Sequence, residues 1–338
     1  MNSVDKVINK SYDTLVGGAE LLDEAAEYIR RGELVAFPTE TVYGLGADAF
    51  NEEAVKCIFI AKGRPQDNPF IVHVASPEGA KAAVSHIPDE AYRLWEKFSP
   101  GPLTIVLPKS ERMPLITTGG LQTVGIRIPN NETALELIRR SGCAIAAPSA
   151  NTSGRISPTR AMDVYEDMRG RIPLILDGGQ TDVGIESTVI DLTSEVPTVL
   201  RPGAITAGML AEVLGEVVNH KGKVVVAAAP GMKYKHYAPK CETVVAADAE
   251  SAKSAYDEAL ARGARPVIIA RSDTCGLLGN RTRIDVGGSE KEICRNIYAA
   301  LHKGEKIADF IVCEHFGEQG ICGSVMNRVL KSAGGKIV

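Results

Sequence analysis

The pattern of apolar runs changes near residue 215, and this change constrains the fold more than any other feature of the sequence. Before it, predicted helices and strands intermix without strict alternation, whereas from residue 242 onward they alternate regularly. The first pattern is typical of a mixed twisted sheet with helices, and the second of a parallel sheet with a helical layer on each face. We therefore expect an α/β chain in which a mixed-sheet domain over 1–215 precedes a small three-layer, Rossmann-like domain over 242–338.

The segment between the two predicted domains, 216–241, has an unusual composition for a tether. It carries five lysines and, after its first residue, no acidic residue. Tyr234 and Tyr237 lie among lysines between Pro230 and Pro239, and a plain spacer does not need such rings. We predict an ordered linker that lies over the cleft of the first domain as a lid, with one of the two tyrosines covering bound ligands. A linker whose rings only hold the two domains together is the alternative.

Composition and charge exclude several classes of protein. The 338 residues carry 38 basic and 42 acidic side chains, and a net charge of −4 argues against a protein that mainly wraps nucleic acid. No signal peptide or membrane span is visible, so we expect a cytoplasmic protein without a membrane partner. Seven cysteines with no C-x-x-C spacing argue against a zinc or dithiol motif and suit a reducing compartment.

Four loops of the first domain combine hydroxyl, amide and charged side chains after predicted strands. Such strand ends face the crevice where α/β proteins bind ligands. We predict that the first of these loops is part of a long loop over 38–51. The four loops span residues 38–46, 62–69, 148–159 and, as one pair, 186–188 with 200–203.

Basic residues of these loops suggest an anionic ligand. Lys62 and Arg64 follow a predicted helix, and we expect both on the exposed wall of a cleft, where a point charge beside a guanidinium suits phosphate. Their alternative role is to satisfy the dipole of that helix. Arg127 lies inside a predicted strand, where an unpaired charge is costly, and Arg201 lies between a strand end and a Pro-Gly turn. A lone strand histidine such as His73 is more often a core residue.

Together these cations suit a nucleoside triphosphate, with a second ligand that carries a carboxylate. The sequence has no G-x-x-x-x-G-K-[ST] phosphate loop and no evident Ser–His–Asp set or pair of catalytic carboxylates. Chemistry by positioning and charge neutralisation therefore fits better than covalent catalysis.

A set of motifs in fixed order resembles the YrdC-like family of threonylcarbamoyl-AMP synthases, and the match runs from about residue 15 to residue 206. The linker motif Lys-Tyr-Lys-His-Tyr-Ala-Pro and the terminal Asn-Arg-Val-Leu-Lys resemble the long two-domain form of the enzyme. The motifs of the first domain are Pro38-Thr-Glu-Thr-Val-Tyr-Gly-Leu, Lys62-Gly-Arg-Pro, Pro148-Ser-Ala-Asn-Thr-Ser-Gly, Glu186-Ser-Thr-Val-Ile-Asp and Leu200-Arg-Pro-Gly.

The resemblance implies a reaction and a set of roles. L-threonine, bicarbonate and ATP would give threonylcarbamoyl-AMP and pyrophosphate, with Mg²⁺ bound through ATP rather than by protein ligands. The product would pass to tRNA threonylcarbamoyl-transferase proteins that modify an adenosine of tRNA. Lys62 and Arg64 would be catalytic. The threonine site would comprise Thr41, His73, Arg127, Ala147 and Ser187, and the ATP site Arg64, Asn68, Thr123, Ser149, Asn151, Ser157, Arg201 and Tyr237.

Two other classes of protein stay open at this point. A carbamoyl-adenylating enzyme of the hydrogenase-maturation type shares the YrdC-like domain, but it would carry zinc-finger cysteines that this chain lacks. An RNA-binding module without enzymatic activity would hold double-stranded RNA by shape on a concave basic face, and a weak RNA contact of the enzyme is likewise open. Threonine-dependent release of pyrophosphate from ATP separates the three.

Overall fold

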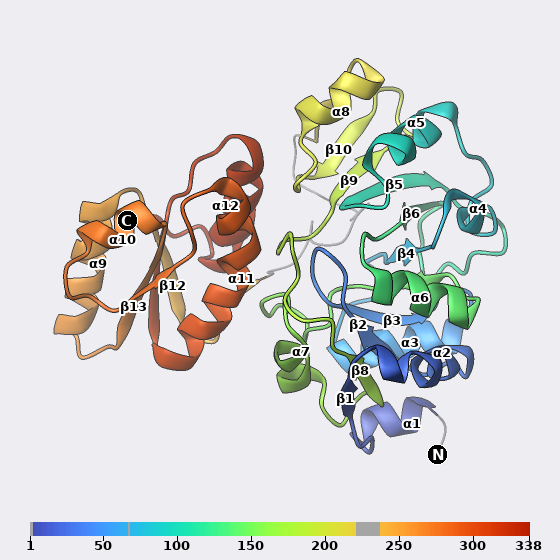
Figure 1. Cartoon of the computed structure of the whole chain (residues 1–338), viewed down its shortest axis with the longest axis horizontal. Coiled ribbons are helices and arrows are strands. Elements are labelled where there is room, and N and C mark those ends of the chain that lie inside the picture. The colour runs from blue at the N-terminus through green and yellow to red at the C-terminus, as the bar shows by residue number, and fades with distance from the viewer. Residues whose placement is uncertain (1–2, 67, 221–236) are drawn as a thin grey trace. The chain divides into compact units, whose positions relative to one another are not determined.

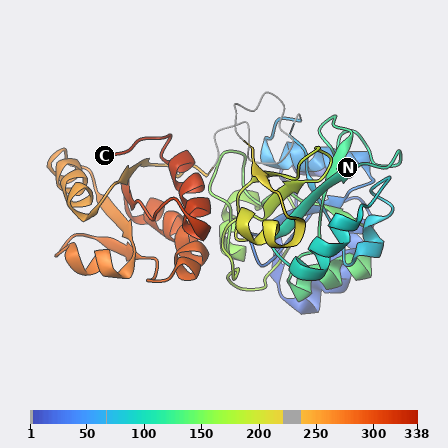
Figure 2. The same ribbon diagram turned by 90° about the horizontal axis from the view of Figure 1, so that it is seen from above.

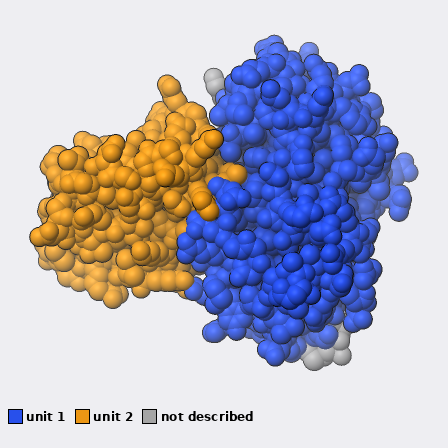
Figure 3. Space-filling view, viewed as in Figure 1, with its two compact units in different colours: residues 1–153, 158–182, 186–233 blue, residues 154–157, 183–185, 234–338 orange. Residues whose placement is uncertain are grey.

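The computed structural model describes residues 3–66, 68–220 and 237–338, and its contacts divide the chain into two compact units (Figure 3). The first unit comprises 1–153, 158–182 and 186–233, and the second comprises 154–157, 183–185 and 234–338. Two short segments of the first predicted domain thus belong to the second unit. Residues 221–236, most of the predicted lid, lie outside the described residues, so the lid stays a prediction.

The first unit is built on a mixed sheet of eleven strands, in the order β1-β8-β2-β3-β7-β4-β6-β5-β9-β10-β11. Parallel and antiparallel neighbours both occur, which confirms the predicted mixed sheet. The strands are β1 (Leu15–Gly17), β2 (Val35–Phe37), β3 (Gly44–Asp48), β4 (Ile71–His73), β5 (Leu103–Pro108), β6 (Thr123–Arg127), β7 (Ile145–Ala146), β8 (Leu174–Leu176), β9 (Thr188–Asp191), β10 (Thr198–Arg201) and β11 (Val218–Asn219). The helices are α1 (Ser3–Ile8), the 3-10 turn η1 (Ala19–Leu21), α2 (Leu22–Arg30), α3 (Glu52–Lys62), α4 (Pro77–Ala80), α5 (Asp89–Phe98), α6 (Glu132–Ser141), α7 (Ala161–Met168) and α8 (Ala207–Leu214).

Strand β3 corrects the prediction of a long loop over 38–51. It pairs antiparallel with β2 and with β7, so it lies inside the sheet. Its sequence, Gly-Leu-Gly-Ala-Asp, has no β-branched residue and therefore gives no strand signal. Glycine is needed there, because a Cβ atom at Gly46 would lie 2.8 Å from side-chain atoms of Ile145 and Phe37.

The two faces of this sheet have different cores, and this difference positions the site. The large core contains Val72, Ile126 and Ile105 from β4, β6 and β5, together with side chains of α3 and α5. Successive strand residues point to opposite faces, so the neighbours of these three residues, His73, Arg127 and Thr104, point to the other face of the sheet. On that face α2 and α6 pack over β2, β7 and β8.

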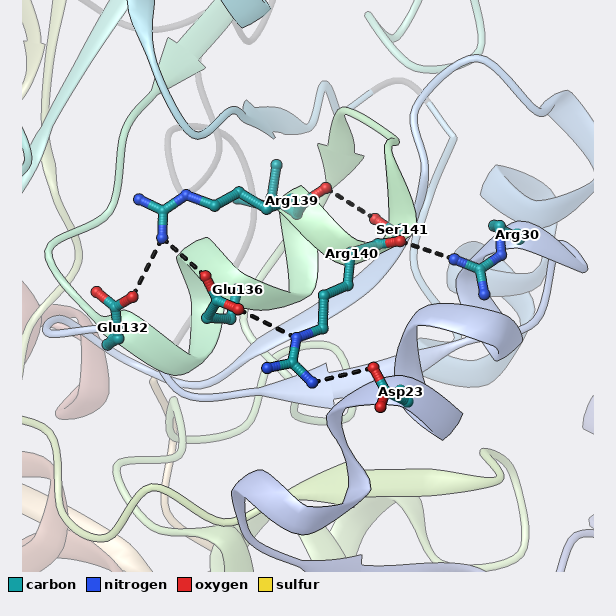
Figure 4. A network of polar contacts seen from close by, with 8 residues as sticks. Asp23, Arg30, Glu132, Glu136, Arg139, Arg140 and Ser141 are labelled. Carbon is teal, nitrogen blue, oxygen red and sulfur yellow. Dashed lines mark hydrogen bonds and ion pairs between the residues drawn. The ribbon is translucent and has the colours of Figure 1, made fainter.

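Exposed ion pairs add to the contact between α2 and α6 (Figure 4). The Arg140 guanidinium donates to Glu136 within its own helix at 3.1 Å and to Asp23 of α2 at 3.0 Å. Arg30 of α2 donates to the carbonyl oxygen of Arg140 at 2.7 Å. Exposed pairs of this kind contribute little stability, so the apolar contact between the helices carries most of the packing.

The second unit has a four-stranded sheet in the order β12-β15-β13-β14, and all of its strand pairs are parallel, as predicted. Helices α9 and α10 cover one face, and α11 and α12 the other (Figures 1 and 2). Among the described residues, no helix is both long and apolar enough to cross a membrane. The elements are β12 (Glu242–Ala246), α9 (Ala249–Ala261), β13 (Pro266–Ala270), α10 (Ser272–Leu277), β14 (Arg283–Asp285), α11 (Glu290–Ile307), β15 (Phe310–Glu314) and α12 (Gly320–Ser332).

Candidate active site

Helix α3 ends at Lys62, and its end places two of the predicted site residues. Gly63 closes the helix in the left-handed region, with φ 61°, so the chain turns sharply before Arg64. The Lys62 ammonium donates to the carbonyl oxygen of Ser149 at 2.5 Å and also to the carbonyl oxygen of Asn151. Lys62 is only 2% exposed, so the expectation of an exposed lysine was wrong. These two carbonyl oxygens, from the loop after β7, stabilise the Lys62 ammonium in the interior of the protein.

Burial changes the chemistry of Lys62. Loss of hydration, together with the positive charge of Arg64, lowers the pKa of Lys62 well below its ordinary value. An anion bound beside the ammonium would oppose that shift and favour the charged form.

Four of the eight predicted ATP residues, Arg64, Asn68, Ser149 and Asn151, lie in the two loops beside Lys62. The Ser149 hydroxyl donates to Asn151 Oδ1 at 2.5 Å. The Arg64 guanidinium lies over the Phe70 ring, 5.3 Å from its centroid, and donates to the carbonyl oxygen of Pro69 at 3.2 Å. Residues 62–66, 68–70 and 149–151 thus form one polar wall.

A second cluster of the first unit centres on Arg127. Its guanidinium donates to Glu40 Oε2 at 2.7 Å, and both residues are 4% exposed. The strand arginine therefore has a partner, a carboxylate 87 residues away in the chain, which the sequence did not reveal. Glu40 was absent from the predicted site, although it follows a buried strand as other site residues do.

His73 lies beside Arg127, because the two residues are partners in the register of β4 and β6. Its ring meets Phe37 edge to face at 6.0 Å. Burial, reinforced by the charge of Arg127, lowers the pKa of His73 to about 3, so the imidazole is neutral at neutral pH. Its Nδ1 is buried and has no hydrogen-bond partner.

Thr104, Ser187 and Arg201 form a third group next to Arg127. Thr104 is the register partner of Arg127, and its hydroxyl lies 2.8 Å from that of Ser187. Arg201 donates through Nε to the Ser187 carbonyl oxygen and through NH2 to the Ser187 hydroxyl, both at 3.0 Å. Thr104 was not predicted, because nothing in its strand sequence distinguishes it from a core residue.

Thr41 is held by its own loop. Its backbone N–H donates to Thr39 Oγ1 at 3.1 Å, and the two hydroxyl oxygens lie 2.8 Å apart. Since the Thr39 hydroxyl donates to the Val42 carbonyl oxygen, the Thr41 hydroxyl donates to Thr39 and keeps its lone pairs for another donor. Ala147 is buried and bonds through its N–H to Ile71 at 2.9 Å.

The remaining predicted residues have other surroundings. Thr123 begins β6 and is half-buried, opposite Pro108 of β5. Ser157 and Tyr237 belong to the second unit. The Ser157 carbonyl oxygen lies 3.3 Å from His302 Nε2, and the Tyr237 ring stacks on Tyr298 at 5.6 Å.

Several buried polar atoms of the predicted site residues and of Glu40 have no hydrogen-bond partner. They are Asn68 Oδ1, His73 Nδ1, Glu40 Oε1 and Arg127 Nε. Buried polar groups are normally satisfied in folded proteins. A guanidinium next to a carboxylate, a neutral imidazole and several hydroxyls suits a zwitterion such as an amino acid, while the Lys62 and Arg64 wall suits phosphates.

The His73 pKa predicts a pH dependence of stability. An unfolded histidine gains a proton below its ordinary pKa of 6.5, whereas the folded one stays neutral down to about 3. Between these values the unfolded state binds more protons, so stability falls as the pH falls. From pH 7 to pH 5 the wild type should lose about 2 kcal/mol more than His73→Asn, measured by urea unfolding. Equal losses in both proteins would contradict the neutral buried imidazole.

Family comparisons agree with this fold. The Sua5_yciO_yrdC family, described as "Telomere recombination", matches residues 27–203. The Sua5_C family, described as "Threonylcarbamoyl-AMP synthase, C-terminal domain", matches residues 205–334. Fold and site thus define a two-domain protein of the Sua5/YrdC class.

Individual relatives narrow this class. A threonylcarbamoyl-AMP synthase of Pyrococcus abyssi is 47% identical over 93% of this chain and 94% of its own, and one of Bacillus subtilis is 40% identical over 93% of each. The crystal structure of P. abyssi Sua5 complexed with L-threonine superposes with a TM-score of 0.90 and 43% identity, covering 96% of this chain and 98% of that one. The chain belongs to the threonylcarbamoyl-AMP synthase family.

Proposed function

We propose that this protein makes threonylcarbamoyl-AMP and pyrophosphate from L-threonine, bicarbonate and ATP. The observation that carries the proposal is that the first unit holds both the Arg127 cluster and the Lys62 and Arg64 wall. The cluster offers a guanidinium, a neutral imidazole and hydroxyls to an amino acid. The wall offers two cations and small polar groups to a triphosphate.

The chemistry needs positioning more than covalent catalysis. The threonine amine adds to carbon dioxide drawn from bicarbonate and forms a carbamate with loss of a proton. A carbamate oxygen then attacks the α-phosphorus of ATP in line, and the bond to pyrophosphate breaks. Lys62 and Arg64 stabilise the negative charge on the phosphates, and Arg127 orients the threonine carboxylate.

Magnesium enters this proposal as part of the substrate MgATP. The described residues contain no group of three or more His, Cys, Asp or Glu side chains that could hold a metal ion. Mg²⁺ in phosphate sites is usually held by substrate oxygens and water, with few protein ligands. We further propose a cytoplasmic enzyme whose product is consumed by a tRNA threonylcarbamoyl-transferase. Release of pyrophosphate with threonine, serine or no amino acid tests the activity directly.

Arg64→Ala tests the phosphate wall. We expect synthesis to fall by roughly two to three orders of magnitude, as loss of a preorganised charge contributes about 2–4 kcal/mol to the barrier. The fold should persist, because Arg64 is half-exposed. Arg112→Ala is the matched control, since Arg112 lies over the Phe50 ring at 5.7 Å, outside the polar wall. Near-normal turnover in the Arg64 variant would show that Arg64 does not stabilise the phosphates during synthesis.

A further inference from the structure

The last turn of α7 carries an acidic residue whose place the helix itself does not explain. Asp167 lies one residue before the end of α7, near the negative end of the helix dipole, where a carboxylate is unfavourable. It is half-buried, and its Oδ2 accepts a hydrogen bond from the backbone N–H of Thr152 at 2.9 Å. Thr152 belongs to the loop after β7, 15 residues earlier in the chain. The carboxylate therefore fastens α7 to that loop.

The same loop contacts Lys62 through three of its residues. The Lys62 ammonium donates to the carbonyl oxygens of Ser149 and Asn151. The backbone N–H of Ser153 donates to the Lys62 carbonyl oxygen at 2.8 Å. Thr152 lies between Asn151 and Ser153, so the α7 carboxylate binds the loop between two of its contacts with Lys62. A shift of Thr152 would therefore disturb the place of the ammonium.

Charged groups near Lys62 act on its ammonium in opposite directions. Burial and the positive charge of Arg64 lower the pKa of Lys62, whereas the negative charge of Asp167 raises it. The Arg171 guanidinium is also close, because it donates to a carbonyl oxygen in the last turn of α3 at 2.6 Å. Residues 148–153 of the loop have uncharged side chains. Among these groups, Asp167 is thus the one whose charge favours the ammonium over the neutral amine.

We propose that Asp167 is a positioning residue of the synthase, which keeps Lys62 in place and charged for the phosphates of ATP. Its hydrogen bond fixes the loop that receives the ammonium, and its charge favours the protonated form. Asp167 acts through Lys62 and does not touch the substrate. The inference rests on the proposed function, in which Lys62 stabilises the phosphates.

Two substitutions separate the charge of Asp167 from its hydrogen bond. Asp167→Asn keeps an oxygen that can accept from Thr152 but removes the charge, whereas Asp167→Ala removes both. The alkaline limb of kcat/KM for MgATP reports a group of the free enzyme that must be protonated. Loss of a nearby negative charge disfavours the ammonium, so Asp167→Asn should move this limb to lower pH. Where the wild type keeps half of its maximum, this variant should keep about a quarter of its own.

Asp167→Ala should move the limb in the same direction and also release the loop. We therefore expect its kcat on the plateau below the limb to be at least about tenfold lower than that of Asp167→Asn. Asp13→Asn is the matched control, since it removes the same charge from an exposed residue of the first unit and should keep the wild-type profile. Thermal unfolding of each variant verifies that the fold is retained.

The protonation of Lys62 can also be followed without turnover. In NMR spectra of the full chain with lysines isotopically labelled at Cε, Lys62→Arg identifies the Lys62 signal by its absence. That signal should titrate at lower pH in Asp167→Asn than in the wild type. A wild type that releases no pyrophosphate would contradict the proposed function, while the NMR titration still decides whether Asp167 controls the charge of Lys62. An unchanged Lys62 titration in Asp167→Asn, or equal plateau kcat in Asp167→Asn and Asp167→Ala, would overturn the role of Asp167.

Discussion

Replacing Glu40 by alanine should lower the free energy of unfolding by about 3–5 kcal/mol. The Glu40 carboxylate and the Arg127 guanidinium are buried together at 2.7 Å. Removing one partner leaves the other charge inside the protein without compensation, which costs far more than the net contribution of the pair. Urea unfolding at pH 7 measures the loss.

Two further variants distinguish a buried unpaired charge from simple loss of packing. Glu40→Leu combined with Arg127→Met should recover most of the stability, because an apolar pair can replace a buried ion pair with little change, while synthesis stays absent. Glu27→Ala is the matched control. Glu27 binds Arg30 and Arg31 on the exposed surface of α2, so its loss should cost less than about 1 kcal/mol. A loss at Glu40 no larger than at Glu27 would contradict the buried pair.

The ion pair of Arg127 with Glu40 could be predicted from the sequence only in part. The cost of an unpaired charge in a strand singled out Arg127, but its partner Glu40 is 87 residues away, in the loop after β2, and three strands separate β2 from β6 in the sheet. The motif after β2 placed Glu40 at a strand end without saying which way its side chain points. Periodicity gives strands and faces, whereas long-range pairing depends on the order of strands across the sheet.

Other differences between the predictions from the sequence and the structure also have local causes. The regular alternation of the second unit predicted its parallel sheet, since α9, α11 and α12 are long enough to show a pattern, whereas the short α10 and β14 were not predicted. Strand β3 was missed because two glycines replace β-branched residues where Phe37 and Ile145 pack closely. Lys62 was expected at the surface because it ends a helix, and only its contact with the carbonyl oxygens of Ser149 and Asn151 explains its burial.

The enzyme should reject valine far more strongly than serine. Valine has the shape of threonine but lacks the hydroxyl, and the buried Thr41 hydroxyl oxygen and the unpartnered His73 Nδ1 would then face a methyl group. Sites that hydrogen-bond a substrate hydroxyl disfavour the analogue without it by roughly ten-thousand-fold, whereas a missing methyl costs about 1–3 kcal/mol. We therefore expect kcat/KM for valine to be lower than for threonine by about four orders of magnitude, and for serine by one to two. Pyrophosphate release with each amino acid measures the ratios.

Variants at Thr41 show whether this residue provides the discrimination. Thr41→Val removes the hydroxyl oxygen that would accept a hydrogen bond from the substrate. It should reduce the preference for threonine over valine by at least about tenfold, chiefly by lowering kcat/KM for threonine. Thr41→Ser keeps a hydroxyl that can still donate to Thr39, so it should keep most of the preference. The two variants differ little in volume at a residue that is fully buried, so a common packing defect would affect both equally. If the wild type uses valine with the same kcat/KM as serine, the pocket around Thr41 and His73 does not recognise the substrate hydroxyl.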